Sequence, residues 1–96
     1  MAEKLNLDEI KNLKNNLPDS WKIKKGKELE AEFKFPDFRT AMVFVNKISQ
    51  LAENINHHPD ICISYNKVQL KLTTHSTGGL TEKDFELAKE ISLLYF

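Results

Sequence analysis

The three histidines of this chain, His57, His58 and His75, all lie between positions 57 and 75. An imidazole has an ordinary pKa of about 6.5, so near neutral pH it can either donate or accept a proton. Rings of this kind beside one substrate could supply the acid and the base of a proton-transfer reaction. Whether they meet depends on the elements of secondary structure that carry them.

The spacing around the histidines predicts how they are positioned. We expect His57 on the last turn of a helix, one turn after Glu53 and on the same face, so that Glu53 could orient its imidazole. Pro59 disfavours helical geometry at His58, which should therefore lie past the helix end and point elsewhere. His75 should follow a strand and precede a glycine turn, where backbone can approach a ligand. A helix end, a strand end and a loop can then converge on one cleft.

The residue types alone leave other interpretations open. A metal site could draw on the histidines and Cys62, although adjacent histidines cannot easily turn both rings to one ion, and no C-x-x-C or H-E-x-x-H spacing is present. Cys62 could instead be a nucleophile with a histidine base. The simplest alternative is a set of polar residues at the ends of elements. Asp84 likewise has a structural explanation, as the N3 residue of a helix that begins at Thr81.

Periodicity and stop signals predict seven elements in the order α-β-β-α-β-β-α. A first helix should begin at a capping box of Asn6 and Glu9 and end at Pro18. Asp37 should cap a central helix that runs to about Asn56 or His57. The other elements are strands at 21–24, 29–35, 61–65 and 68–74, and a last helix from 81. This order predicts a single α+β two-layer domain over 1–96, with a four-stranded, mostly antiparallel sheet and helices packed on one face.

Alternation of apolar and polar residues predicts which side chains are buried. In the last strand, the even positions from Val68 to Thr74 should face one way, and Asn66–Lys67 should form the two-residue turn before it. The buried helix stripes should contain Leu7, Ile10, Leu13 and Leu17 in the first helix, and Phe85, Ala88, Ile91 and Leu94 in the last. The other sheet face and the apolar tail at 93–96 would leave surface for self-association.

Composition excludes several classes of protein. Lys+Arg and Asp+Glu number 14 each, so the chain lacks the positive surplus of a general nucleic-acid or anionic-membrane binder. Cys62 is the single cysteine, which rules out an internal disulfide and fits a reducing compartment. No signal peptide or membrane-spanning apolar run is present, so we expect a cytoplasmic protein.

Several short motifs in this register resemble the signature of the pterin-4a-carbinolamine dehydratase family. They are E-x-x-x-H-H-P at 53–59, Y-N-K-V at 65–68 and T-T-H at 73–75, followed by G-G-L-T at 78–81 and by Asp84. The likeness runs from about Trp21 to Ile91 without an evident insertion, and the order of elements agrees with the family fold. One departure is Ile61, where many relatives carry a tryptophan.

The resemblance implies a role for each matching residue. His57, His58 and His75 correspond to the active-site histidines, and Glu53 and Asp84 to acidic groups that support them. The implied pterin contacts come from these histidines together with Pro59, Thr73, Thr74, Ser76, Thr77 and Trp21.

The implied reaction is the loss of the C4a hydroxyl of a tetrahydropterin carbinolamine as water, which gives the quinonoid dihydropterin. It requires neither metal nor cofactor, since the pterin is itself the substrate. A homodimer or homotetramer is implied, with a functional link to an aromatic amino-acid hydroxylase.

The alternative role is that of a transcriptional coactivator, which binds another protein and stabilises its dimer through an exposed helix face such as 38–55. A third possible role is that of a protein with the same fold that acts in another pterin pathway, such as that of molybdopterin.

Overall fold

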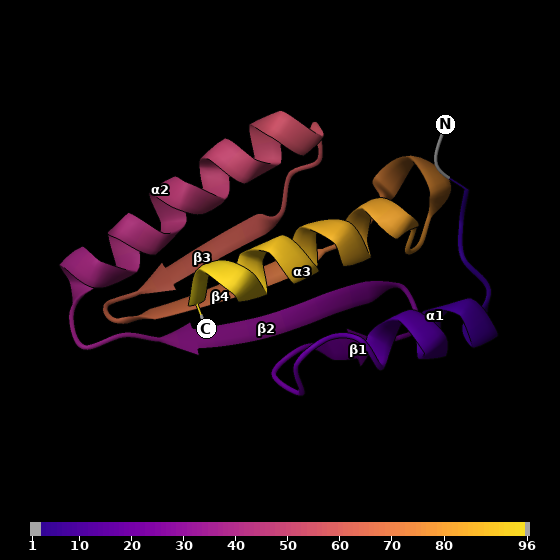
Figure 1. The fold of residues 1–96 in the computed structure, drawn as a ribbon, viewed down its shortest axis with the longest axis horizontal. Coiled ribbons are helices and arrows are strands. Elements are labelled where there is room, and N and C mark those ends of the chain that lie inside the picture. The colour runs from indigo at the N-terminus through magenta and orange to yellow at the C-terminus, as the bar shows by residue number, and fades with distance from the viewer. Residues whose placement is uncertain (1–2, 96) are drawn as a thin grey trace.

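The computed structural model describes residues 3–95 and contains a four-stranded sheet covered by helices (Figure 1). The strands are β1 (Lys22–Lys24), β2 (Glu28–Lys34), β3 (Asp60–Ser64) and β4 (Lys67–Leu72). The sheet order is β1-β2-β4-β3, and every neighbouring pair is antiparallel. The helices are α1 (Leu7–Lys14), α2 (Phe38–Ile55) and α3 (Glu82–Tyr95), with a short 3₁₀ helix η1 (His75–Thr77) between β4 and α3. This α+β architecture confirms the predicted order of elements.

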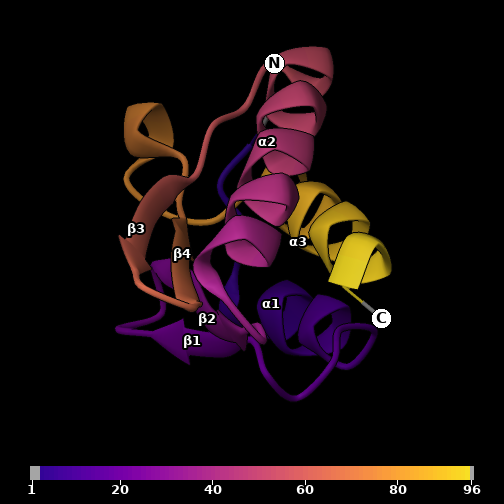
Figure 2. The same cartoon turned by 90° about the vertical axis from the view of Figure 1, so that its left-hand side faces the viewer.

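All three α-helices lie on the same face of the sheet, as Figure 2 shows from the end of the molecule. The core forms where the inward side chains of the central strands meet those helices, because alternate strand residues point to opposite faces. Its strand residues include Leu29, Ala31, Phe33, Val68, Leu70 and Leu72, and its helix residues include Ile10, Ala41, Phe44, Ile48, Phe85, Ala88 and Ile91. The predicted inward face of the last strand, ending at Thr74, is confirmed.

The opposite face of the sheet carries charged side chains. Lys71 lies 3.4 Å from Glu30 across the β2–β4 pair, and Lys67 lies 4.0 Å from Glu32. Oppositely charged neighbours on adjacent strands suit a solvated face. Within residues 3–95, no helix is both long and apolar enough to cross a membrane.

The start of α1 agrees with prediction, but its end does not. Asn6 and Glu9 form the expected capping box, with each side chain accepting a hydrogen bond from the other residue's backbone amide. The helix ends at Lys14 rather than at Pro18. Asparagines at 15 and 16 propagate a helix poorly, and the residue before proline avoids helical geometry. Leu7, expected in the buried stripe, is 65% exposed.

Two further local predictions were wrong. The turn between β3 and β4 consists of Tyr65 and Asn66, since Lys67 already pairs with Ser64 in the ladder. The Asn66 side chain donates to the Phe35 carbonyl, and the Asn66 carbonyl accepts from the Phe35 amide, which fixes the turn against the end of β2. In α3 the buried stripe includes Leu87, whereas Leu94 is 36% exposed.

Candidate active site

The central helix ends earlier than expected, and this changes the position of His57. α2 stops at Ile55, and Asn56 adopts the left-handed conformation with φ 58° and ψ 44°. Asparagine tolerates this conformation better than most residues, and it commonly terminates a helix. The amides of Asn56 and His57 both donate to the carbonyl of Ala52, so the chain turns sharply away from the helix axis. His57 is therefore not on the last helical turn.

This turn directs His57 toward α3 rather than toward its own helix. Its Nε2 lies 2.5 Å from Oδ1 of Asp84, and the two side chains are 11% and 0% exposed. The prediction that Glu53 orients His57 was wrong. Glu53 lies 2.5 Å from Nε2 of His58 instead, in a pair whose side chains are 75% and 55% exposed.

The Asp84 carboxylate contacts the start of its own helix and two side chains from other elements. Its Oδ2 accepts from the Thr81 amide at 2.9 Å, as expected for an N3 residue that caps the helix start. The same oxygen accepts from the Thr74 hydroxyl at 2.8 Å. A carboxylate with no exposed surface must have its charge compensated by such donors, and the N-terminal end of α3 adds favourable dipoles. Its remaining oxygen faces the imidazole of His57.

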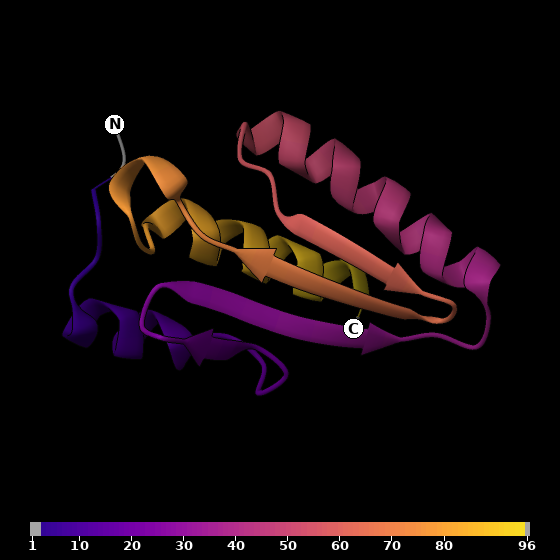
Figure 3. The ribbon, with the colours of Figure 1, turned by 180° about the vertical axis from the view of Figure 1, so that it is seen from behind.

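His75 lies at the same end of the molecule as this pair. It is the first residue of η1 and follows Thr74 directly. The Thr74 hydroxyl and His57 both contact the Asp84 carboxylate. Figures 1 and 3 show the C-terminal end of α2, η1 and the N-terminal end of α3 toward the same end of the long axis. The imidazole of His75 is exposed, and the turn behind it is closed by a bond from the Thr74 amide to the Gly79 carbonyl. The end of β4 and the end of α2 therefore meet through Thr74, Asp84 and His57, and His75 follows Thr74 in the chain.

The hydroxyls of the 73–77 segment are mostly engaged by the protein. Thr73 donates to the carbonyl of Lys27, and Thr77 donates within the turn to the carbonyls of Thr74 and Gly79. Ser76 is exposed, and Pro59 is half-buried at the entry to β3. These bonds give the loop after β4 a defined shape.

Trp21 lies in the core, with 0% of its surface exposed. Its indole Nε1 donates to the Ser92 hydroxyl at 2.8 Å, and its ring meets Phe33 edge-on at 5.9 Å between centroids. The structure does not bring this residue to a surface that a ligand could reach.

Thr81 also contacts Asp84, whereas the sequence interpretation used it only as a helix start and as part of the G-G-L-T motif. Its backbone amide and its hydroxyl both belong to the Asp84 network, the hydroxyl lying 2.9 Å from that of Thr74. The T-x-x-D spacing of a capping box was the available signal, because it places the amide of the first residue at the carboxylate of the fourth.

Metal-binding geometry is not found within the part of the chain from 3 to 95: no three histidine, cysteine or acidic side chains converge there. Cys62 is exposed in β3 and pairs with Gln69 on β4.

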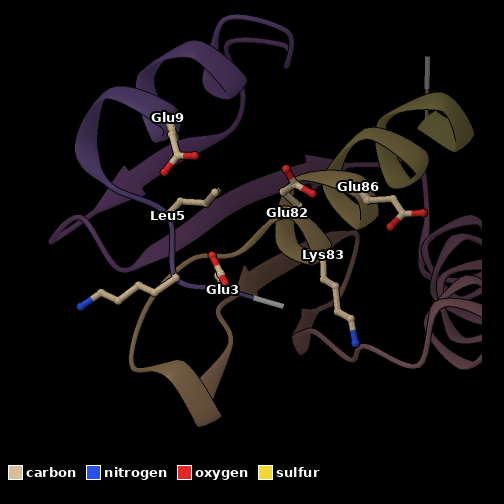
Figure 4. A pocket seen from close by; sticks show the side chains of 7 residues that line it. Glu3, Leu5, Glu9, Glu82, Lys83 and Glu86 are labelled. Carbon is tan, nitrogen blue, oxygen red and sulfur yellow. The ribbon is translucent and has the colours of Figure 1, made fainter. Parts of the chain in front are cut away.

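A separate hollow lies between the N-terminal segment and the start of α3 (Figure 4). Its lining mixes acidic and basic side chains and includes no histidine; the residues are Glu3, Lys4, Leu5, Glu9, Glu82, Lys83 and Glu86.

Comparison with known proteins identifies the family of the chain. The family model described as Pterin 4 alpha carbinolamine dehydratase matches residues 3–94. Two relatives are named "Putative pterin-4-alpha-carbinolamine dehydratase". The one from Cyanothece sp. is 52% identical, and the match covers 98% of this chain and 95% of the relative. The one from Sulfurisphaera tokodaii is 47% identical, and the match covers 96% of this chain and 97% of the relative.

Solved structures show the same fold. A transcriptional coactivator/pterin dehydratase from Brucella Melitensis superimposes with a TM-score of 0.92 at 33% identity, over 98% of this chain and 100% of that one. A pterin dehydratase-like protein identified as a RuBisCO assembly factor in the alpha-carboxysome superimposes with a TM-score of 0.68 at 23% identity. The match covers 79% of this chain and 89% of that one, and it shows a common fold alone. By the matched region and these identities, the chain belongs to the pterin 4 alpha carbinolamine dehydratase family.

Proposed function

We propose that this protein is a pterin-4a-carbinolamine dehydratase that eliminates water from a 4a-hydroxytetrahydropterin by histidine acid–base catalysis. Family membership and the names of its relatives support the reaction class. The observation that carries the assignment to residues is the contact between His57 and the buried Asp84 carboxylate, beside the loop that presents His75. It provides one oriented imidazole and one exposed imidazole at the same end of the fold.

The elimination needs one base and one acid. As the base removes the N5 proton, the N5–H electrons form the C4a=N5 double bond, and the C4a–O bond breaks. The acid protonates the departing hydroxyl, which leaves as water. Proton transfers of this kind each contribute about 10²–10⁴ in rate. No electrons are exchanged with a second molecule, so the reaction requires no redox cofactor.

The geometry favours His57 as the base. With Nε2 engaged by Asp84, its other ring nitrogen is the one available to a substrate. The exposed His75 is then the acid, and His58 orients the pterin and the leaving oxygen. In this assignment Asp84 takes over the role expected of Glu53, and Glu53 restrains His58.

The proposal also covers the setting of the reaction. We place the enzyme in the cytoplasm, as a homodimer or homotetramer that works beside an aromatic amino-acid hydroxylase, which would supply the carbinolamine. The exposed cysteine fits a reducing compartment.

Stopped-flow absorbance tests the catalytic assignment. The carbinolamine would be generated by an aromatic amino-acid hydroxylase and its decay compared with that in buffer, because the reaction also proceeds spontaneously. We expect the wild type to accelerate dehydration, and His57→Ala and His75→Ala each to lose about 10² or more of that acceleration. Ser49→Ala is the control, since this exposed hydroxyl donates only to the Asn46 carbonyl within α2. Wild-type rates in both histidine variants would refute the assignment.

A protein-binding role is the second candidate. The solved structure from Brucella Melitensis is described as a coactivator as well as a dehydratase. In this chain Phe38 and Val43 on α2 are 50% and 49% exposed, so this helix presents apolar side chains that a partner could contact. Gel filtration with candidate partners distinguishes the two roles: a triple histidine substitution should abolish dehydration but leave partner binding intact.

A further inference from the structure

The Thr74 hydroxyl and the Thr81 amide hold Asp84, and the direction of the bond between the Thr74 and Thr81 hydroxyls follows from counting donors. The Thr74 hydroxyl donates to Asp84 Oδ2 at 2.8 Å and also lies 2.9 Å from the hydroxyl of Thr81. A hydroxyl has one hydrogen, so Thr74, which gives its hydrogen to Asp84, must accept from Thr81. The hydrogen bonds therefore run from Thr81 to Thr74 to Asp84.

This chain of bonds is shielded from water. Thr81 and Asp84 are 0% exposed and Thr74 is 9% exposed. Solvent therefore cannot easily replace a missing donor, and a buried acceptor that loses its partner is costly. The backbone is also restrained, because the Thr74 amide donates to the Gly79 carbonyl and the Asp84 amide to the Thr81 carbonyl. The carboxylate is thus held in one orientation.

That orientation decides which nitrogen of His57 is protonated. Two donors, the Thr81 amide and the Thr74 hydroxyl, occupy Oδ2, which leaves Oδ1 to His57 Nε2 at 2.5 Å. An ionised carboxylate can only accept, so Nε2 must carry the hydrogen. In the neutral ring, Nδ1 is then the unprotonated nitrogen.

We infer that Thr74 and Thr81 are positioning residues that, through Asp84, hold His57 in the Nε2–H tautomer and so make Nδ1 its proton acceptor. The catalytic consequence rests on the proposed function, whereas the tautomer does not.

The role differs from the pterin contact that the resemblance implies for Thr74. Its single hydrogen is given to Asp84, and its oxygen accepts from Thr81, so the hydroxyl has no hydrogen left for a substrate. Loss of a substrate contact would raise KM, whereas loss of a positioning bond lowers kcat.

His58 provides an internal comparison. Its partner Glu53 is 75% exposed, so water competes for both groups and this carboxylate is not held in the same way. We expect His58 to populate both tautomers.

The variants change hydroxyl groups with little change of shape. Thr74→Val and Thr81→Val remove one hydroxyl each, and Thr74→Ser retains it. Ser92→Ala is the matched control, because the Ser92 hydroxyl is also buried but bonds to Trp21 and to the Ala88 carbonyl, away from the histidines.

The first readout is the ¹⁵N spectrum of histidine-labelled protein, in which protonated and unprotonated ring nitrogens have well-separated shifts. The signal of His57 is identified by its loss in His57→Gln. We expect the Nε2–H form in the wild type, in Thr74→Ser and in Ser92→Ala, and a mixture of tautomers in the two valine variants. An Nδ1–H form in the wild type would overturn the inference directly.

The second readout is dehydration kinetics. We expect each valine variant to lose about 10-fold in kcat at unchanged KM, because the buried network that holds the Asp84 carboxylate loses a donor. Thr74→Ser should recover most of that loss, and Ser92→Ala should match the wild type. If the valine variants match Ser92→Ala in kcat and tautomer, or raise only KM, the inference fails.

Should Thr74→Val not fold, Thr81→Val decides, since it leaves the Thr74–Asp84 bond in place. A wild type without dehydratase activity would refute the proposed function, while the spectra would still decide the tautomer.

Discussion

His57 and Asp84 lie 27 positions apart in the chain, yet Nε2 of one is 2.5 Å from Oδ1 of the other. The contact forms because α2 ends against the left-handed Asn56, and because α3 begins with a capping residue whose carboxylate faces back toward that turn. One acidic side chain therefore both caps a helix and orients an imidazole.

Replacing Asp84 with asparagine should impair dehydration more than it impairs folding. The substituted side chain still offers an oxygen to the Thr81 amide, but its amide hydrogens would favour an unprotonated Nε2 on His57, the opposite tautomer. We expect kcat for dehydration to fall by about 10-fold or more. Stopped-flow kinetics and thermal unfolding of the same sample check this, and wild-type kcat in Asp84→Asn would contradict it.

Replacing Glu53 with glutamine should have little effect on His57. Glu53 contacts His58 at the surface, and exposed ion pairs contribute about 0–1 kcal/mol. We expect urea unfolding to change by less than about 1 kcal/mol and the His57 nitrogen shifts to stay as in the wild type. A shifted His57 spectrum would mean that Glu53, rather than Asp84 alone, orients this ring.

Replacing Trp21 with phenylalanine should affect stability and leave the KM for the pterin unchanged. The substitution removes a buried hydrogen bond to Ser92 and part of a fully buried ring, which together cost about 1–3 kcal/mol. Urea unfolding measures this loss. A cycle with Ser92→Ala should be non-additive, since both variants break the same bond. A raised KM in Trp21→Phe would instead support the substrate contact implied by resemblance.

The helix cap at Asp37 should make stability depend on pH. The backbone amide of Thr40, with further contributions from its side chain and from Arg39, lowers the pKa of Asp37 below its ordinary value of 3.8. The folded state thus favours the charged carboxylate, so the stabilisation is complete above pH 3.8 and is lost as the pH falls through the lowered pKa.

We therefore expect Asp37→Ala to melt at a lower temperature than the wild type at pH 7, with a difference that shrinks in acid below pH 3.8. Paired circular-dichroism melts across this range measure it. A constant difference would show that the lost stability does not come from the carboxylate charge.

Local residue patterns were enough to predict the elements of this fold. The capping box of Asn6 and Glu9, the cap at Asp37 and the alternation along β2 and β4 all depend on residues within a few positions of one another. Such short-range signals act before any tertiary contact forms, so the order of helices and strands and the buried face of the sheet could be predicted. Their ends were less certain, as Lys14 and Ile55 show.

The pairing within the site was decided only by the tertiary structure. Helical spacing predicted a contact between Glu53 and His57. The left-handed conformation of Asn56 instead turns His57 off that helix face, and Glu53 contacts His58. The partner of His57 comes from α3, a helix separated from it by two strands and a loop, and no local pattern reports that distance. Residue types thus determined which groups could transfer protons, whereas long-range packing determined which carboxylate holds which ring.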